Sequence, residues 1–202
     1  MNATAGPQNA RGARTRAALL EAIHQIVEDE GFEALTMSEV AKRAGVSRRA
    51  VYLHFSNRSE LIPALHDYVV EVLGLEDSLT RVWDEPDPVA ALDEWAGHLV
   101  RVHIEAMGVD RTVRSAMHHD PDVADYRAAV GTRQRRNCRM LIENLDAAGR
   151  LSSRWDLDTG TDMLWALIST DLLEALYRER GWSKDAIREH LSFLLKRTFV
   201  AD

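Results

Sequence analysis

The sequence has a single cysteine and no long apolar run. Cys138 stands alone among 202 residues, so an internal disulfide is excluded and nothing indicates an oxidising compartment. No stretch of about 18 consecutive apolar residues occurs, which leaves no candidate for a membrane span. The polar, Gly- and Pro-bearing first residues are not followed by an apolar segment, so we expect no signal peptide. These absences favour a cytoplasmic protein without a membrane partner.

Motifs of catalysis and metal binding are also missing. There is no glycine-rich phosphate loop, no paired cysteine ligands and no Ser/His/Asp set in a readable context. Adjacent His118 and His119 would diverge on a helix, and the i, i+4 spacing of Glu94 and His98 is common by chance. We therefore predict no catalytic residue, no metal and no cofactor, and an enzyme stays only as an alternative.

What the chain does have is an uneven distribution of charge. The composition is that of an ordinary globular protein, 46% hydrophobic and 28% charged, with a net charge of −7. Residues 1–60 hold 8 of the 25 basic and 7 of the 32 acidic residues, a net charge of +1. The other 142 residues then hold 17 and 25, a net charge of −8. The first part is the candidate for meeting an anionic partner.

Apolar residues recur at three-to-four spacing along nearly the whole chain, and no segment alternates as a strand would. Thr36 with Glu39 and Asn57 with Glu60 fit the capping box that starts a helix. Pro63 falls inside the helix that Asn57 starts, which predicts a kink there. Aspartate caps followed by proline mark two more starts, at Asp87–Pro88 and Asp120–Pro121. The predicted helices span 15–30, 36–44, 47–53, 57–75, 88–106, 110–118, 121–148, 161–180 and 184–200.

The stretch "GVSRRAVYLHF", Gly45–Phe55, follows one short helix and contains a second. A short helix, a turn at a glycine and another short helix are typical of a helix-turn-helix. At about 100° per residue, Arg48, Arg49 and Tyr52 share one side of the second helix while Val51 faces the other. The apolar side can pack on the preceding helices, which leaves the arginines and the tyrosine for the major groove of DNA.

Each of these exposed side chains has a chemistry that suits DNA. Arginine can pair with guanine O6 and N7 or clamp a phosphate, and tyrosine and histidine can donate to phosphate oxygens. Exposed arginines on a helix are more commonly just a solvated face. A second basic run, "TRQRRNCR" at 132–139, spreads around its helix, and there the solvated face is the favoured interpretation.

The longer run "GFEALTMSEVAKRAGVSRRAVYLHFSNRSEL", Gly31–Leu61, resembles the DNA-binding domain of the tetracycline-repressor (TetR) family. The shared features are the Gly-Phe pair, Thr36, the Val-Ala pair before "AGVS", and "YLHF" followed by a basic residue and "EL". The resemblance implies an all-α fold with an N-terminal three-helix DNA-binding domain and a larger helical effector-binding and dimerisation domain. It implies a flexible N-terminal arm at 1–13, a helix-turn-helix domain at 14–57, a connecting helix at 58–76 and the helical body at 77–202.

The resemblance also implies roles for individual residues. Two positions depart from the family pattern: position 49 is often glycine and position 58 more often lysine, so Arg49 and Arg58 bring different geometry. The residues implied to contact phosphates are Thr36, Ser47, Tyr52, His54 and Arg58, and those implied to read bases are Arg48 and Arg49.

By the same resemblance, the body should bind a small-molecule effector and a second copy of the chain. The implied function is a ligand-responsive regulator, most simply a repressor released from a palindromic operator by an effector; a helical ligand-binding protein or enzyme without DNA function is the alternative. Candidate pocket residues are Trp95, Leu99, His103, Met107, Met117, Tyr126, Gln134, Asn137, Met140 and Trp165. For the aromatic and Met residues, ordinary core packing is the favoured role. Gln134 and Asn137 interrupt an apolar stripe, and they either orient a polar group of the ligand or belong to a solvated patch. Candidates for the homodimer interface are Leu172, Leu176, Ile187, Leu191 and Leu194. Asp171 interrupts that apolar stripe, and an edge position explains it most simply.

Overall fold

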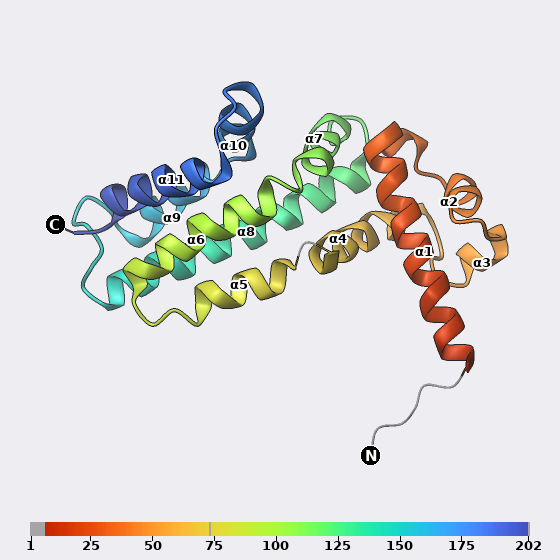
Figure 1. Ribbon diagram of the computed structural model, residues 1–202, viewed down its shortest axis with the longest axis horizontal. Helices are drawn as coiled ribbons and strands as arrows, with labels where there is room; N and C mark the ends of the chain where they lie inside the picture. Colours follow the sequence, from red (N-terminus) through yellow and green to blue (C-terminus); the bar gives the residue numbers. More distant parts are fainter. Residues whose placement is uncertain (1–6, 73, 202) are drawn as a thin grey trace, which may run out of the picture. The chain divides into compact units, whose positions relative to one another are not determined.

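The computed structural model describes residues 7–72 and 74–201, and within them all regular structure is helical apart from one isolated antiparallel bridge, Leu151 to Val200 (Figure 1). The prediction of an all-α fold is confirmed. The chain divides into two compact units: residues up to 70 with 111–127 form unit 1, and residues 71–110 with 128–202 form unit 2. The α-helices are α1 Pro7–Glu30, α2 Met37–Arg43, α3 Arg48–Tyr52, α4 Leu61–Val72, α5 Leu75–Trp83, α6 Pro88–His103, α7 Met107–Ala116, α8 Pro121–Ala147, α9 Leu157–Leu167, α10 Thr170–Glu174 and α11 Lys184–Phe199.

Unit 1 is built on the apolar stripe of α1. Leu19, Ile23 and Ile26 lie on one face of that helix at helical spacing and have no exposed surface. In Figure 1, α1 lies beside α2, and α2 packs on α3. Val51 of α3 and Phe55 after it complete the buried cluster. Burial of these side chains, at about 1.5–3 kcal/mol each, holds the short helices in place because five- and seven-residue helices are not stable alone.

The first helix starts earlier than the sequence predicted. We expected a flexible arm to residue 13 and a helix from Thr15, but α1 begins at Pro7. Proline suits a first helical position, where its missing N–H has no acceptor, and helix-compatible alanines and arginines follow it. The arm prediction is therefore wrong for residues 7–13, and residues 1–6 lie outside the described part of the chain.

The predicted helix over 57–75 consists of two segments, and a further helix follows them. A 3-10 turn, Arg58–Glu60, precedes α4, and Pro63 is the third residue of α4. In the first turn its missing donor costs nothing, so no kink inside a continuous α-helix arises and that prediction is wrong. After α4, Gly74 adopts a left-handed conformation with φ 59°, and α5 starts at the next residue. The sequence analysis missed α5 entirely.

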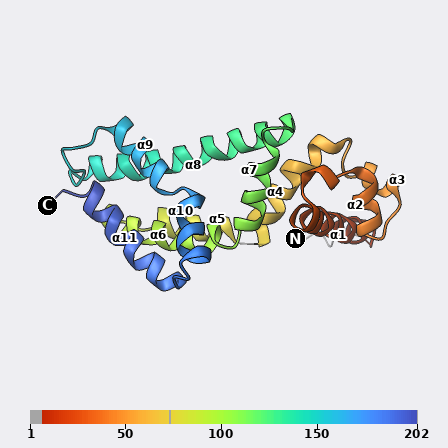
Figure 2. The same cartoon turned by 90° about the horizontal axis from the view of Figure 1, so that it is seen from above.

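Unit 2 has its own core. Trp95 and Leu99 of α6, Leu141 of α8, Leu164 of α9 and Phe199 of α11 belong to one buried cluster. Helices α5 and α11 pack on α6. Figure 2 shows α9 against α8, where Arg135 and Arg139 of α8 form ion pairs with aspartates of α9. The two long predicted helices, 88–106 and 121–148, match α6 and α8 closely.

The predicted helix over 161–180 is interrupted. Helix α9 starts four residues earlier, at Leu157, because the Asp156 carboxylate accepts the N–H of Asp158 and Thr159 in a capping box. It ends at Leu167, and Ser169 then caps α10. A π-helical turn, Ala175–Glu179, leads to Gly181 with φ 69°. The apolar spacing continued across the break, so periodicity alone could not locate it.

Candidate nucleic-acid interface

Helices α2 and α3 with the turn between them form a helix-turn-helix. The Thr36 hydroxyl accepts the N–H of Glu39 at 3.1 Å and caps α2, although Glu39 itself pairs with Lys42 instead of closing a full capping box. Gly45 makes the turn with φ 66°, a conformation that favours glycine. The Ser47 hydroxyl then accepts the N–H of Ala50 at 3.2 Å and caps α3. Both hydroxyls still have a hydrogen to donate to a phosphate.

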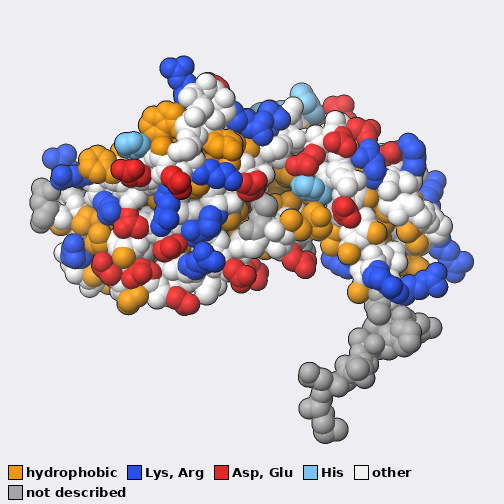
Figure 3. Space-filling model, in the orientation of Figure 1, with side chains coloured by type: hydrophobic (Ala, Val, Ile, Leu, Met, Phe, Trp, Pro, Cys, Tyr) orange, Lys and Arg blue, Asp and Glu red, His pale blue; other side chains and the backbone are white. Residues whose placement is uncertain are grey.

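The predicted sidedness of α3 is present. Val51 is fully buried under the helix, whereas Arg48 and Arg49 are exposed. Tyr52 is 49% exposed, and His54 is partly buried beside the Phe55 ring, with ring centroids 6.5 Å apart. Figure 3 shows Lys and Arg side chains gathered at the edge of the molecule that carries α2 and α3. The face turned away from the core thus offers cationic and hydroxyl donors.

The basic side chains of residues 11–58 fall into two groups. Lys42, Arg43 and Arg58 are each in an ion pair within the chain. The others are exposed and have no ion-pair partner within the described residues: Arg11, Arg14, Arg16, Arg48 and Arg49. Of these, the three in α1 were not among the predicted site residues. Arg16 lies over the Phe55 ring at 5.4 Å from its centroid, next to the end of α3.

Arg58, for which the resemblance implies a phosphate contact, makes several contacts within unit 1. Its guanidinium is directed into unit 1, where it donates to two backbone carbonyls and to the carboxylate of Asp120. Burial alone would raise the pKa of Asp120, but the hydrogen bond and charge of Arg58 and the N–H groups of Val123 and Asp122 hold it below its usual value. From the sequence, Asp120 was predicted only to cap a helix. Its pairing with Arg58 was not predicted, because 62 residues separate the two.

The candidate effector residues fall in both units. Met117 and Tyr126 belong to unit 1 and the other eight to unit 2. Met140 and Trp165 are 39% exposed, which argues against a pocket role for either. Trp95, Leu99 and Met107 are buried in the core of unit 2, and His103, Gln134 and Asn137 are partly buried.

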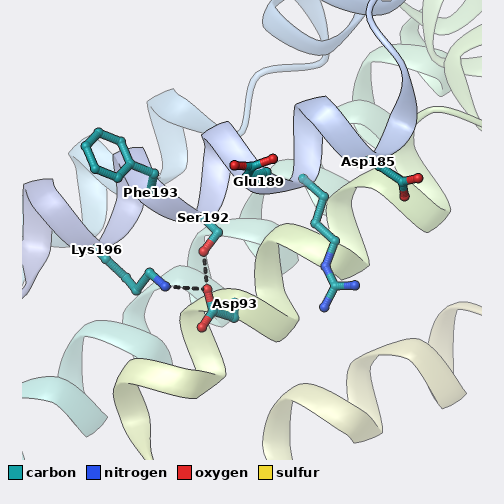
Figure 4. Close-up of a pocket in the computed structure, with 7 residues that line it drawn as sticks. Asp93, Asp185, Glu189, Ser192, Phe193 and Lys196 are labelled. Atoms are coloured by element: carbon teal, nitrogen blue, oxygen red, sulfur yellow. Dashed lines mark hydrogen bonds and ion pairs between the residues drawn. The ribbon is translucent and has the colours of Figure 1, made fainter.

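A groove of about 560 Å³ lies between α6 and α11 and involves none of these candidates. Figure 4 shows Ser192 and Lys196 directed at Asp93, while Phe193 points away. Lys196 Nζ lies 2.8 Å from Asp93 Oδ1, and Ser192 donates to the same oxygen. Burial would raise the pKa of Asp93, but these two hydrogen bonds and the charges of Lys196 and Arg188 lower it overall. Asp93 and Lys196 thus pair with each other inside the groove.

The interface candidates divide by burial. Ile187 and Leu191 are 1% and 5% exposed because they pack in the core of unit 2. They are therefore not available for contact with a second copy of the chain. Leu172 and Leu194 are 38% and 40% exposed, and Leu176 is intermediate. Asp171 is exposed, as an edge position requires. Other large apolar side chains exposed on α9–α11 and just before α11 are Met163, Trp165, Tyr177, Trp182 and Phe193.

The described residues contain no helix that is long and apolar enough to cross a membrane. In the same part of the chain, no group of three or more His, Cys, Asp or Glu side chains is placed to hold a metal ion.

A helix-turn-helix with an outward arginine pair, carried on an all-helical chain, defines a DNA-binding regulator of the helix-turn-helix class. The family model described as "Bacterial regulatory proteins, tetR family" matches residues 19–65. Over 165 residues the chain is 32% identical to the "HTH-type transcriptional regulator TtgR" of Pseudomonas putida, a match that covers 76% of each chain. The chain therefore belongs to the TetR family and is a DNA-binding transcriptional regulator.

Other relatives are also named as regulators, and solved structures share the fold. The "HTH-type transcriptional repressor BepR" of Brucella suis is 25% identical over 186 residues, which is 86% of each chain. Among solved structures, NalD of Pseudomonas aeruginosa, described as "the secondary repressor of MexAB-OprM multidrug efflux pump", has a TM-score of 0.72 at 22% identity, over 96% of this chain and 99% of that one. A transcriptional regulator from Saccharomonospora viridis in complex with choline has a TM-score of 0.72 at 20% identity, over 94% and 100%. At these identities the structures support the fold alone.

Proposed function

We propose that the protein is a repressor that binds a palindromic operator as a homodimer and is released by a small-molecule effector. The observation that carries this proposal is the exposed, unpaired Arg48–Arg49 pair on the outer face of α3. Two arginines on a helix that fits the major groove can read guanines or clamp phosphates. The role is regulatory and not catalytic, and it is exerted in the cytoplasm, where bacterial DNA lies.

The DNA contacts follow from exposure and free donors. Arg48 and Arg49 read bases, and Tyr52, Ser47 and Thr36 donate to phosphates, as all five are exposed. His54, partly buried, is a further candidate for phosphate contact. DNA binding is assigned to residues 14–57, the connection to 58–76 and the effector and dimer functions to 77–202.

The sign of regulation rests on relatives' names. BepR and NalD are both named as repressors, although FasR of Mycolicibacterium smegmatis, 36% identical over 93 residues, is named as an activator. One fold neighbour is described in complex with choline and another, SmeT, in complex with triclosan, so small organic molecules are reasonable effectors.

We place the effector in unit 2, beside Trp95. The indole Nε1 of this residue is buried and has no hydrogen-bond acceptor among the residues that the structure describes. A buried donor of this kind is costly, and a ligand with an acceptor atom would satisfy it. Such an effector regulates only if its affinity differs between DNA-competent and DNA-incompetent states, typically by about 1–3 kcal/mol.

A palindromic operator requires two recognition helices related by a twofold axis. We propose that Leu172 and Leu194, with Phe193, contact a second copy of the chain. These side chains are exposed on α10 and α11 of unit 2, and large exposed apolar side chains can mark an interaction surface.

The test is a selection of genomic DNA fragments bound by the purified protein, followed by affinity measurements on the fragments recovered. We expect a palindromic consensus and an affinity that falls as salt rises. Replacing Arg48 or Arg49 with alanine should cost about 1–3 kcal/mol of specific binding, a factor of about 5 to 150. Arg43→Ala is the control, because Arg43 is already paired with Asp29 and Glu30. Equal affinity for recovered and scrambled fragments would rule the proposal out.

A further inference from the structure

One guanidinium, that of Arg58, joins three separate segments of unit 1. Its Nε donates to the Leu35 carbonyl at 2.9 Å, and its Nη2 donates to the Phe32 carbonyl at 2.8 Å. The same Nη2 lies 2.7 Å from Oδ2 of Asp120, and Nη1 lies 3.8 Å from a carboxylate oxygen of Asp122. Only 31% of the side chain is exposed. Most of its donors are thus already directed at acceptors inside the protein.

The three segments have a particular place in the chain. Phe32 is the first residue of the 3-10 turn Phe32–Ala34 that precedes α2, and Leu35 follows that turn. Arg58 follows α3. The guanidinium therefore fastens both ends of the helix-turn-helix, residues 36–57, to each other. Asp120 and Asp122 add the start of α8, the helix that continues into unit 2.

The acidic side of this cluster is held in place independently. Oδ1 of Asp120 accepts the N–H of Asp122 at 3.1 Å and caps α8, while Oδ2 faces Arg58. The Ser59 hydroxyl donates to Oδ2 of Asp122 at 2.7 Å. Arg58 and Ser59, consecutive residues of the 3-10 turn Arg58–Glu60, therefore both contact the start of α8. Contacts other than those of Arg58 therefore also orient the two carboxylates.

The guanidinium geometry is required for these contacts. Donors on Nε and Nη2 diverge in one plane and reach two carbonyls and a carboxylate at once. A lysine ammonium has three donors, but all of them leave a single atom, so it cannot reproduce contacts that start from two separate nitrogens. The arginine at this position, where the family more often has lysine, therefore fits an internal role.

We propose that Arg58 and Asp120 form a brace that positions the recognition helix α3, and that Arg58 makes no phosphate contact. The brace closes the two ends of the helix-turn-helix and ties them to α8. Arg58 is thus a positioning residue, whereas Arg48 and Arg49 touch the DNA. This proposal rests on the proposed DNA-binding function for its effect on affinity, but the brace itself can be tested without DNA.

The DNA-free test is amide hydrogen exchange on the full-length protein with Arg58→Lys and Asp120→Asn. Both changes keep the side chain close in size, and asparagine can still cap α8. The brace predicts that exchange in α2 and α3 becomes at least about tenfold faster in each variant, while exchange in the core of unit 2 is unchanged. Arg43→Lys is the control, since it alters a paired arginine of α2 outside the brace. Unchanged exchange in α2 and α3 in both variants overturns the proposal.

The DNA test compares a recovered operator fragment with a scrambled duplex of equal length. If the brace exists, Arg58→Lys and Asp120→Asn should each weaken binding to the operator by about tenfold. The double variant should bind the operator no more weakly than the weaker-binding of the two single variants. Affinity for the scrambled duplex should be unchanged in all three. A phosphate contact instead predicts that Arg58→Gln lowers the slope of log K against log salt by about 0.9 on both duplexes, with Asp120→Asn harmless.

Absence of the brace can be told apart from absence of operator binding. If no operator is recovered, hydrogen exchange still decides whether the brace exists. If an operator is recovered and the second pattern appears, Arg58 is a phosphate contact and the brace is rejected.

Discussion

At the scale of single residues, burial determines which reactive groups are available. Cys138 of α8 has no exposed surface, and burial raises the pKa of its thiol to about 12 against small opposing effects of a backbone hydrogen bond and Arg135. A thiol in this state is neither a nucleophile nor a metal ligand at neutral pH. The sequence showed that the cysteine was alone, and only its environment shows that it is inert.

We predict that native Cys138 reacts with a thiol reagent at least about a hundredfold more slowly than the unfolded chain, because reaction requires thiolate and access. Absorbance of released thionitrobenzoate measures the rate. An added cysteine at the exposed Ala129 of the same helix, A129C, should react rapidly and give one fast thiol. Two fast thiols in that variant would contradict the prediction.

His98 is the second residue whose chemistry burial decides. It is 3% exposed and stacks on Trp95 with ring centroids 5.1 Å apart, and its Nδ1 lies 3.0 Å from the Ser78 hydroxyl. Burial, then the positive charges of His103 and Arg101, lower its pKa to about 3. The folded protein therefore holds this imidazole neutral at every pH at which it operates.

The low pKa of His98 predicts acid sensitivity. Between pH 6.5 and about 3 the unfolded chain binds a proton at this site and the folded one does not, so the free energy of unfolding falls as the pH falls. The slope from this group is at most about 1.4 kcal/mol per pH unit. Urea unfolding of the native protein and of His98→Asn between pH 4.5 and 7 measures it. The native protein should lose more stability across this range than the variant, and parallel curves would contradict the assignment.

At the scale of elements, short local signals were reliable and extended periodicity was not. The caps predicted at Thr36, Ser47, Asp87 and Ser183 are all present, because each depends on a few neighbouring residues. Helix continuity after position 57 and after position 161 was predicted wrongly. Apolar spacing persists through the breaks at Gly74 and Ser169, where a left-handed glycine and a serine cap start the next helix.

The turn between α2 and α3 gives a prediction at this scale. Gly45→Ala should lower the free energy of unfolding by about 1 kcal/mol, since φ of 66° strains a residue with a Cβ although no atom lies within 4 Å of that position. Gly12→Ala is the matched control: it has equal space but lies inside α1, where alanine should stabilise by up to about 1 kcal/mol. Denaturant unfolding distinguishes the two signs, and equal effects would reject the explanation by φ.

At the scale of the whole molecule, the proposed function requires two copies of the chain. If the exposed apolar region of unit 2 joins them, Leu194→Glu should convert the dimer to monomer at micromolar concentration, because a carboxylate would be buried against apolar groups. Sedimentation velocity measures the mass. Leu53→Glu is the control, since Leu53 is an even more exposed leucine, at 78%, on unit 1. A dimer that survives Leu194→Glu would remove this residue from the interface.

The sequence by itself determined the all-helical class, the position of the helix-turn-helix and the family. These depend on local signals: caps, a glycine at the turn, and apolar spacing that orients a short helix. Only the tertiary structure decided what each polar or apolar side chain does. Arg48 and Arg58 are both arginines ten positions apart, yet one faces solvent and the other faces Asp120. Ile187 and Leu194 share one helix, yet one lies in the core. Burial and ion pairing arise from contacts between distant segments, which local sequence does not encode.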